Sequence, residues 1–364
     1  MIRVDGKELL DFCSNDYLGL ANHDQVKQTL INAVNKYGTG ATASQLISGY
    51  TDLHQELEQY LADWMGYEKV ILFGNGYLAN LAVIQALTDK NSVILGDRLN
   101  HASLVDAALA STGKFKRYLH SSTASLNKKL QSIDSYQNPL VITDAVFSMD
   151  GDIAPLPEYT DMCAKAGACL FVDDAHGFGI MGKHGKGTRE LFGLTTQDIP
   201  VMMATFGKAL GTHGAFVASD ADIIEHLLQT ARTLIYTTAI PPAWAAASQR
   251  ALLLLEQESW RREKLHGLIK RFAQGAAAMG LPVLPSQTAI QPFIVGETHA
   301  AVAMSEALSA SGFFIPAIRP PTVPTHSARL RITLSARHSG SDIDRLLDVL
   351  GQLWKQTNNR NKNE

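Results

Sequence analysis

The sequence predicts an α/β protein with a mainly parallel central sheet covered by helices, followed by a smaller α/β domain. Three observations predict this class. Short apolar runs alternate with helical patterns from residue 69 onward, the runs lack polar alternation, and long amphipathic helices begin near residue 250. Unbroken apolar runs are typical of strands buried on both faces, as in parallel sheets.

The strands of the large domain are predicted in chain order from these runs. They read "KVILF", "SVILGD", "KFKRYL", "PLVITDAV", "ACLFVD" and "IPVMMATF". The segments between them are long enough to hold crossover helices. Ligands of such sheets bind at the carboxyl ends of the strands, so functional residues are expected just after these runs.

The smaller domain is predicted from a change of texture. A long helical pattern over 248–280 precedes the strand-like runs "AIQPFIVG", "GFFIPAIRP" and "ARLRITLSA" and a last helix near 340–355. The polar, aromatic-free end of the chain is predicted to be disordered. The predicted organisation is an N-terminal segment 1–17 packing with the small domain, a large domain 18–250, a small domain 251–355 and a tail 356–364.

Composition excludes several classes of protein. The 364 residues are 46% hydrophobic and 18% charged, as in an ordinary globular enzyme or binding protein, and the net charge of −3 predicts no nucleic-acid partner. The three cysteines show no C-x-x-C spacing, which predicts neither a disulfide framework nor a metal site and favours the reducing cytoplasm. No apolar run approaches the roughly 20 residues of a membrane span, and no export signal is recognised.

One glycine pattern, Gly177-x-Gly179-x-x-Gly182, invites interpretation as a dinucleotide-binding loop after a strand. Asp173 and Asp174 stand between the strand and these glycines, where their charges would repel a pyrophosphate. The residues after Gly182 also lack the apolar helical pattern that such a loop requires. The dinucleotide interpretation is therefore rejected.

A lysine and an aspartate point to a different cofactor. Lys208 is the only charged residue between positions 199 and 219 when His213 is neutral, and an amine in such an apolar turn is favoured as a nucleophile. Asp173 ends a predicted strand 35 residues earlier. A lysine for a Schiff base and an aspartate for a pyridinium nitrogen are the minimal apparatus for pyridoxal 5′-phosphate, PLP. The alternative interpretations are that Lys208 extends to the surface from an apolar turn and that Asp173 only caps a helix.

The phosphate of such a cofactor needs a cradle. Gly74-x-Gly76 joins a strand to a helix whose N-terminus favours an anion, and Thr205 could offer a hydroxyl. His101 opens a helix after a strand, where it either caps the helix or stacks on a planar ring. His176, three residues after Asp173, could reach the phenolic oxygen of the cofactor.

The motifs "SNDYLGL", "FSMDGDIAPL", "VDDAHGFG", "TFGKALG" and "IRPPTVP" together resemble the α-oxoamine synthases, which are fold-type I PLP enzymes. The resemblance covers nearly the whole chain with the motifs in family order. "QLISGYTDLHQELE" and "AIRPPTVPTHSARLRITL" most resemble the branch of the family that joins L-alanine to a pimeloyl thioester, carried by a carrier protein or by coenzyme A, in biotin biosynthesis.

The resemblance implies a role for each matching residue. It gives Lys208 the Schiff-base link, Asp173 the ring nitrogen, His176 the phenolic oxygen and His101 the stacking position. It further implies phosphate or cofactor contacts at Gly76, Tyr77, Ser148 and Thr205, contacts across a homodimer interface at Thr237 and Thr238, and substrate contacts at Asn15, Arg319, Thr322 and Arg331. Arg319 could equally be a surface arginine, although Pro320 and Pro321 stiffen the chain after it.

Two departures from the family stand out. Family members usually carry about thirty more residues before "LDFCSNDYLGL", so the N-terminal segment is expected to be shortened, with consequences for acyl-donor binding. "GTGATASQLISGY" replaces a run that is richer in serine and glycine in the family. The alternatives left open are another α-oxoamine synthase that uses glycine with acetyl or succinyl donors, an aminotransferase of the same fold, and a catalytically silent scaffold.

Overall fold

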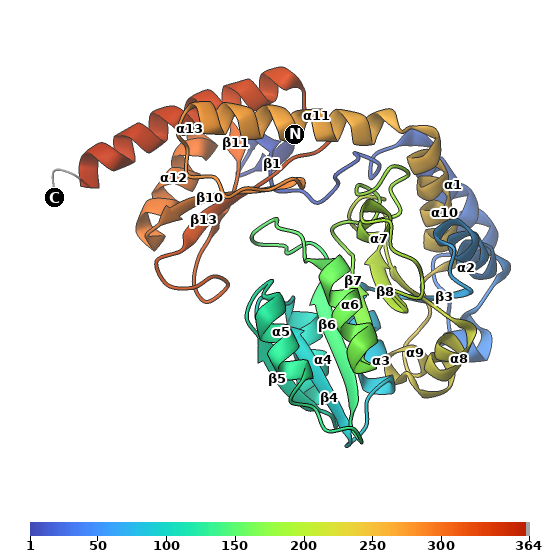
Figure 1. The fold of residues 1–364 in the computed structure, drawn as a ribbon. Coiled ribbons are helices and arrows are strands. Elements are labelled where there is room, and N and C mark those ends of the chain that lie inside the picture. The colour runs from blue at the N-terminus through green and yellow to red at the C-terminus, as the bar shows by residue number, and fades with distance from the viewer. Residues whose placement is uncertain (362–364) are drawn as a thin grey trace. The chain divides into compact units, whose positions relative to one another are not determined.

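The protein is described by a computed structural model over residues 1–361, in which the chain forms two compact units. The large unit comprises Leu20–Phe147 and Ile153–Glu258, and the small unit comprises Met1–Gly19, Ser148–Asp152 and the chain from Ser259 onward. Figure 1 shows the chain with most of its helices and strands labelled. The short insertion Ser148–Asp152, which the sequence prediction leaves in the large domain, belongs to the small unit.

The large unit is built on a seven-stranded sheet. Strands β8, β7, β6, β4 and β5 pair in parallel, whereas β9 is antiparallel to both of its neighbours, so the predicted, mainly parallel α/β class is confirmed. The sequence analysis missed β9. The strand order is β3 (Lys69–Phe73), β9 (Ala215–Ser219), β8 (Val201–Thr205), β7 (Cys169–Asp173), β6 (Asn138–Asp144), β4 (Ser92–Asp97) and β5 (Lys114–Tyr118).

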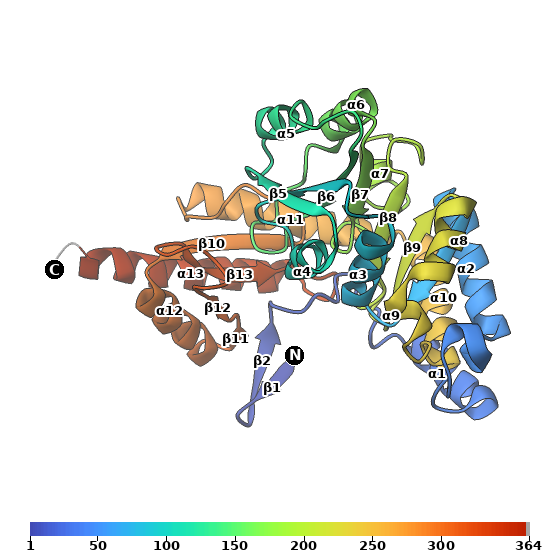
Figure 2. The same ribbon diagram turned by 90° about the horizontal axis from the view of Figure 1, so that it is seen from below.

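The helices of this unit cover both faces of the sheet. Figure 2 shows α5 and α6 on one face and α3 and α4 on the other. Right-handed crossovers that run along the sheet in opposite directions must place their helices on opposite faces. The helices are α1 (Asp24–Tyr37), α2 (Asp52–Met65), α3 (Gly76–Ala86), α4 (Ala102–Ala110), α5 (Thr123–Leu130), α6 (Leu156–Ala166), α7 (Thr188–Leu191), α8 (Ala221–Thr230), α9 (Arg232–Ile235) and α10 (Pro242–Gln257), with a π-helical turn at Gln45–Gly49.

This arrangement positions the site. The chain leaves β4 toward β5 through α4 and leaves β6 toward β7 through α6, so the crossovers diverge between these neighbouring strands. In an open α/β sheet such a divergence opens a crevice at the carboxyl ends of the strands. The strands themselves are a rigid platform, because the side chains of Ile94, Ile142, Phe171 and Val201 are fully buried in one apolar core.

The glycine-rich segment after β7 packs around a buried carboxylate. It forms turns, and the next helix, α7, begins only at Thr188. A Cβ atom at Gly177 would collide with Oδ1 of Asp174, and one at Gly187 would collide with Oδ2. The glycines therefore make room for the Asp174 side chain, which agrees with rejection of a dinucleotide-binding loop.

The small unit contains two three-stranded sheets. One has the order β1 (Ile2–Val4), β2 (Lys7–Asp11) and β11 (Phe313–Phe314). The other has the order β10 (Ile290–Gly296), β13 (Ala328–Thr333) and β12 (Ala317–Ile318). The helices are α11 (Trp260–Ala278), α12 (Thr298–Ala310) and α13 (Gly340–Asn361).

The predicted helical pattern over 248–280 forms two helices, because Glu258 leaves the helical conformation with φ −111° and ψ 55° between α10 and α11. One prediction near the end of the chain needs correction. The predicted tail 356–364 is wrong for residues 356–361, which continue α13 without a glycine or proline to stop it; residues 362–364 lie outside the described part of the chain. Within residues 1–361, no helix has the length and apolarity of a membrane span.

Candidate active site

A cavity of about 180 Å³ in the large unit brings together the residues on which the prediction depends. It lies at the carboxyl ends of the parallel strands, where ligands of such sheets bind. The predicted residues that line it are Gly76, Tyr77, His101, Asp173, His176, Thr205 and Lys208. Residues that the sequence analysis did not select also line it, namely Asn80, Ser103, Asp144, Ala175 and Met203.

Two carboxylates stand side by side at the base of the cavity. Asp144 ends β6 and Asp173 ends β7, and the two are paired in the parallel register. Asp173 is 5% exposed; its Oδ2 accepts a 2.8 Å hydrogen bond from the amide of Asn80, and its Oδ1 accepts one from the backbone N–H of Ala175. Burial, followed by the neighbouring Asp173, raises the pKa of Asp144 well above its usual value. Asp144 therefore tends to keep its proton and limits the negative charge at the base.

His101 is both a helix cap and a cavity residue. Its Nδ1 accepts a hydrogen bond from the backbone N–H of Ser103 at the start of α4. Its own backbone N–H donates to Oδ2 of Asp144 over 2.6 Å. The capping interpretation and the cofactor interpretation are thus compatible, since the cap orients the imidazole while the ring lines the cavity.

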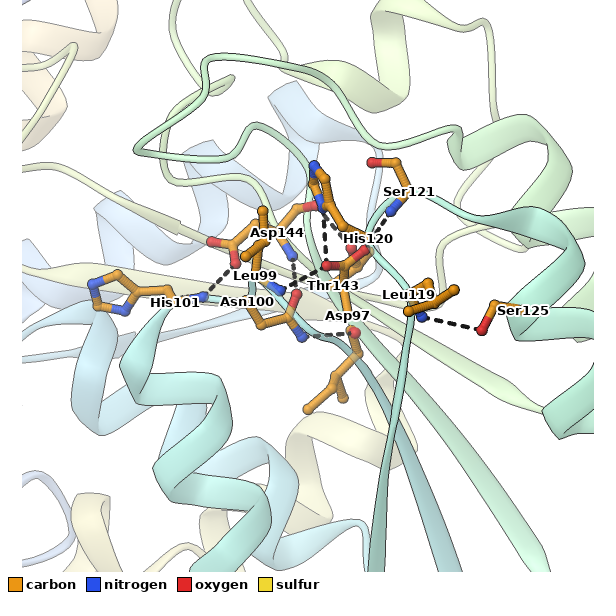
Figure 3. Close-up of polar contacts among 11 residues, drawn as sticks. Asp97, Leu99, Asn100, His101, Leu119, His120, Ser121, Ser125, Thr143 and Asp144 are labelled. Atoms are coloured by element: carbon orange, nitrogen blue, oxygen red, sulfur yellow. Dashed lines mark hydrogen bonds and ion pairs between the residues drawn. The ribbon is translucent and has the colours of Figure 1, made fainter. Parts of the chain in front are cut away.

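Figure 3 shows how the loop that carries His101 is tied to the strand ends. The amide of Asn100 donates to the carbonyl of Ile142 and accepts from the backbone N–H of Asp144, so it bridges to β6. Asp97, fully buried at the end of β4, accepts from the backbone N–H groups of Leu99 and Ser121 and contacts the imidazole of His120 at 3.0 Å. These contacts fix the backbone at position 101 without help from a ligand.

Lys208 lies in the tight connection between the antiparallel strands β8 and β9. The connection closes through backbone hydrogen bonds from Phe206 N–H to Gly214 and from Gly211 N–H to Lys208. Thr205 donates its hydroxyl to the carbonyl of Gly214 and accepts from the N–H of Gly207. The half-buried lysine is therefore presented from a hairpin and not from a mobile loop.

The predicted phosphate cradle is the N-terminus of α3. Asn75 caps this helix through Leu78 N–H, while Gly76 and Tyr77 line the cavity. The helix dipole and unpaired N–H groups of the first turn favour an anion here. Tyr77 is 43% exposed, and its hydroxyl donates to Asp106.

Three further predicted residues meet in the small unit around Arg331. This arginine on β13 is 8% exposed, and its guanidinium donates to the backbone carbonyl of Ser148, the hydroxyl of Thr333 and the side-chain oxygen of Asn15. All three acceptors are uncharged. Arg329 on the same strand differs, because its guanidinium forms an ion pair with Asp150. We refer to Asn15, Ser148 and Arg331 as the Arg331 cluster.

The remaining predicted residues are not brought to either place. Thr237 and Thr238 do not line the cavity; Thr237 donates to the carbonyl of Thr233, and Thr238 forms a bridge with Ser44. Arg319 and Thr322 are exposed on the connection between β12 and β13, joined by a backbone hydrogen bond from Thr322 to Arg319. Their roles stay predictions.

The residues that sequence reasoning missed carried recognisable patterns. Asp144 ends an apolar strand just as Asp173 does, so the argument used for Asp173 applies to it. Asn80 lies one turn after Gly76 among the apolar residues of α3, where a polar side chain calls for a partner. Ser103 follows His101 by two residues, at helix-capping distance.

A larger cavity of about 490 Å³ lies beside the edge strand β3 and contains none of the predicted site residues. It contains the half-buried carboxylate of Glu58, which accepts hydrogen bonds from Tyr50, Gln45 and the backbone N–H of Leu72. Burial raises the pKa of Glu58 to about 7. The carboxylate is already supplied with donors from the chain, so its contacts account for a structural role.

The small cavity has the chemistry that PLP requires. A lysine amine, a strand-end carboxylate and a helix N-terminus meet in it, matching the aldehyde, the ring nitrogen and the phosphate of PLP. The fold and this donor set define the class of fold-type I PLP-dependent enzymes.

Comparison with known proteins agrees with that class. The family model "Aminotransferase class I and II" matches residues 7–350, and the chain belongs to this family and, within it, to the α-oxoamine synthases. It is 51% identical over 97% of its length to 8-amino-7-oxononanoate synthase of Pseudomonas paraeruginosa, covering 88% of that protein.

Solved structures extend the similarity. A structure of SPT with PLP has a TM-score of 0.94 at 30% identity, covering 97% of this chain and 89% of the other. The 8-amino-7-oxononanoate synthase of Francisella tularensis has a TM-score of 0.83 at 29% identity, covering 96% of this chain and 98% of the other. The predicted family and cofactor are confirmed.

Proposed function

We propose that the protein is a PLP-dependent acyltransferase that condenses L-alanine with a pimeloyl thioester to make 8-amino-7-oxononanoate for biotin biosynthesis. The observation that carries this proposal is the 51% identity, over 97% of the chain, to an 8-amino-7-oxononanoate synthase. One C–C bond forms between Cα of alanine and the thioester carbonyl carbon. The thiol leaves, the alanine carboxyl departs as CO2, and a proton returns to Cα.

The large unit would perform the chemistry. Bound PLP supplies an electron sink for negative charge at Cα of the amino acid. Lys208 would hold the cofactor covalently and, once displaced by the substrate amine, would remove the Cα proton with Nζ and later return one. Asp173 would accept a hydrogen bond from the ring nitrogen, which keeps that nitrogen protonated. His101 would stack on the ring, and His176 would donate to its phenolic oxygen.

Two sets of residues would bind the charged groups of the ligands. Gly76, Tyr77 and Thr205 would receive the cofactor phosphate at the N-terminus of α3. Asn15 and Arg331 would receive the alanine carboxylate, because among the described residues the buried guanidinium of Arg331 has only uncharged acceptors and keeps its positive charge available. Ser148 was predicted to contact the cofactor, but it does not line the cavity of the large unit, so its role stays a prediction. Arg319 and Thr322 would contact the acyl donor.

A homodimer with shared sites is part of this proposal. Thr237 and Thr238 lie away from the cavity of their own chain, as expected for residues that reach the phosphate of a partner. Exposed apolar side chains gather beside them, because the bridge between Ser44 and Thr238 joins the two segments that carry these side chains. The side chains are Leu46, Ile47, Tyr50 and Tyr236. A patch of this kind favours association with another copy of the chain. We place the enzyme in the cytoplasm, in keeping with its cysteine content.

The decisive experiment is mass spectrometry of the products formed from alanine or glycine with pimeloyl, acetyl and succinyl thioesters, each as coenzyme A and carrier-protein derivatives, and from alanine with a keto acid. The proposal expects 8-amino-7-oxononanoate and CO2 from the pimeloyl donors. Product only from glycine with acetyl or succinyl donors would assign glycine C-acetyltransferase or 5-aminolevulinate synthase activity instead.

The matching family model is named for the class I and II aminotransferases, so transamination is the second candidate activity. An aminotransferase would convert alanine to pyruvate with a keto-acid acceptor and would form no acylated product. Absence of every product from cofactor-loaded protein would identify a silent scaffold. The same mass spectra therefore separate all the candidates.

A further inference from the structure

Asn80 connects two groups that line the cavity from different elements. It is fully buried on α3, and its side-chain nitrogen lies 2.8 Å from Oδ2 of Asp173 and 2.8 Å from Oγ of Ser103. Oγ of Ser103 in turn lies 2.7 Å from Nδ1 of His101. A continuous row of hydrogen bonds therefore runs from Asp173 through Asn80 and Ser103 to His101.

The direction of each hydrogen bond in this row is determined. The backbone N–H of Ser103 donates to Nδ1 of His101, so Nδ1 must carry a lone pair. The Ser103 hydroxyl must then donate to that nitrogen as well, and its oxygen is left to accept from Asn80. The ring proton of His101 consequently lies on Nε2.

The orientation of the Asn80 amide follows from the same geometry. A flipped amide would place its oxygen against the Asp173 carboxylate, where two acceptors would face each other across 2.8 Å. With the nitrogen placed there, both of its hydrogens are used, one toward Asp173 and one toward Ser103. The row therefore has one consistent polarity from end to end.

The arrangement has a cost that stability alone does not explain. Oδ1 of Asn80 is buried and has no hydrogen-bond partner among the described residues. A buried amide oxygen without a partner is unfavourable, and an apolar side chain of similar volume would avoid this cost. The polar residue at this position is therefore best explained by the hydrogen bonds from its nitrogen to Asp173 and Ser103.

We propose that Asn80 and Ser103 are positioning residues that couple Asp173 to His101 and hold the His101 imidazole as the Nε2–H tautomer. The proposal rests on the proposed function only in assigning the cavity to the PLP ring, with Asp173 at one edge of the ring and His101 over its face. Asn80 would then act on the cofactor site through Asp173 and His101.

The test compares Asn80→Leu and Ser103→Ala in the full-length holoenzyme and in the cofactor-stripped protein. Imidazole nitrogens are observed by NMR after labelling histidine with ¹⁵N, and His101 is assigned with a His101→Gln variant. The wild type should show one protonated and one bare nitrogen at His101. Ser103→Ala leaves Nδ1 of His101 with only the longer, 3.2 Å hydrogen bond from the backbone N–H at position 103, and Asn80→Leu frees the Ser103 hydroxyl to turn away from Nδ1. In both variants the two resonances should therefore move toward each other as the Nδ1–H tautomer becomes populated, and the dissociation constant of PLP should rise about tenfold.

Ser111→Ala is the matched control, because Ser111 follows the same helix and donates only to the carbonyl of Ala108. Unchanged His101 resonances in both variants, or equal changes in Ser111→Ala, would overturn the proposal. If the His101 resonances change in Ser103→Ala but not in Asn80→Leu, Asn80 does not influence the His101 tautomer. If Asn80→Leu does not fold, the resonances of Ser103→Ala alone test the proposal. These spectra need no substrate, so they are independent of the product analysis that tests the proposed function.

Discussion

The cavity of the large unit and the Arg331 cluster of the small unit differ in how their buried charges are compensated. In the cavity, Asp173 accepts hydrogen bonds from Asn80 on α3 and from the backbone N–H of Ala175, and Asp144 tends to keep its proton. In the cluster, the guanidinium of Arg331 donates, among the described residues, to neutral oxygens only, although Arg329 on the same strand forms an ion pair with Asp150. The cavity is balanced before ligand arrives, whereas the cluster keeps an unbalanced positive charge.

This difference indicates which residues should act in catalysis and which in substrate binding. Groups that are held by rigid strand ends and satisfied by the protein are suited to act on reacting atoms. A buried cation without a carboxylate is suited to bind an anionic substrate group. Substitutions in the cavity should therefore reduce the rate of the chemical step, and substitutions in the small unit should weaken substrate binding.

Lys208→Ala should have the largest effect. Loss of the amine removes both the covalent link to the cofactor and the base for the Cα proton, so turnover should fall by at least about 10³-fold while the fold is retained. The measurement is product formation together with borohydride reduction and peptide mapping. Cofactor trapped on another lysine of the wild type would contradict the assignment.

Asp173→Asn should have the second largest effect. The variant should still bind PLP, but a ring nitrogen without a carboxylate partner should slow removal of the Cα proton by about 10²- to 10³-fold. Exchange of the Cα hydrogen of alanine with solvent deuterium measures this step directly. A wild-type exchange rate would show that Asp173 has no such role.

Arg331→Lys tests the other side of the comparison. Lysine keeps the charge but loses the planar fork, so KM for alanine should rise about tenfold with little change in PLP affinity. Arg329→Lys is the matched control on the same strand, and it should affect stability more than KM because its partner is Asp150. Equal KM values for the two variants would place Arg331 among structural arginines.

Arg319→Ala should have the smallest effect. The side chain is exposed on the connection before β13, and contacts of exposed charges are typically worth up to about 1 kcal/mol. We expect KM for the acyl thioester to rise up to about fivefold and KM for alanine to stay unchanged. Identical kinetic constants in variant and wild type would show that Arg319 is a surface residue without a role in acyl-donor binding.

Sequence reasoning reached most of the cavity because its residues follow strands. Asp173 and Lys208 stand just after apolar runs, and parallel strands deliver such positions to one edge. Asn80 is recognisable as a polar residue among the apolar residues of α3, but its partner Asp173 lies 93 positions away, and no local pattern identifies that contact.

The small unit was harder to predict for a physical reason. The Arg331 cluster joins three distant segments, and the family resemblance assigned Asn15 and Arg331 to the substrate but Ser148 to the cofactor. The helix over 356–361 was missed because polar composition alone was taken as disorder, although nothing in that stretch stops a helix that is already formed.

The long sequence separation between Asn80 and Asp173 has a consequence for the order in which the protein folds. The hairpin that carries Lys208 closes locally between Phe206 and Gly214, whereas Asn80 and Asp173 meet only after 93 residues of intervening chain are in place. In the proposed site PLP contacts both Lys208 and Asp173, so it would bind tightly only when the large unit is complete. A ligand at about 100 times its dissociation constant stabilises the native state by about 2.7 kcal/mol. The supply of cofactor during synthesis would therefore affect the amount of native protein that accumulates, as well as its rate of turnover.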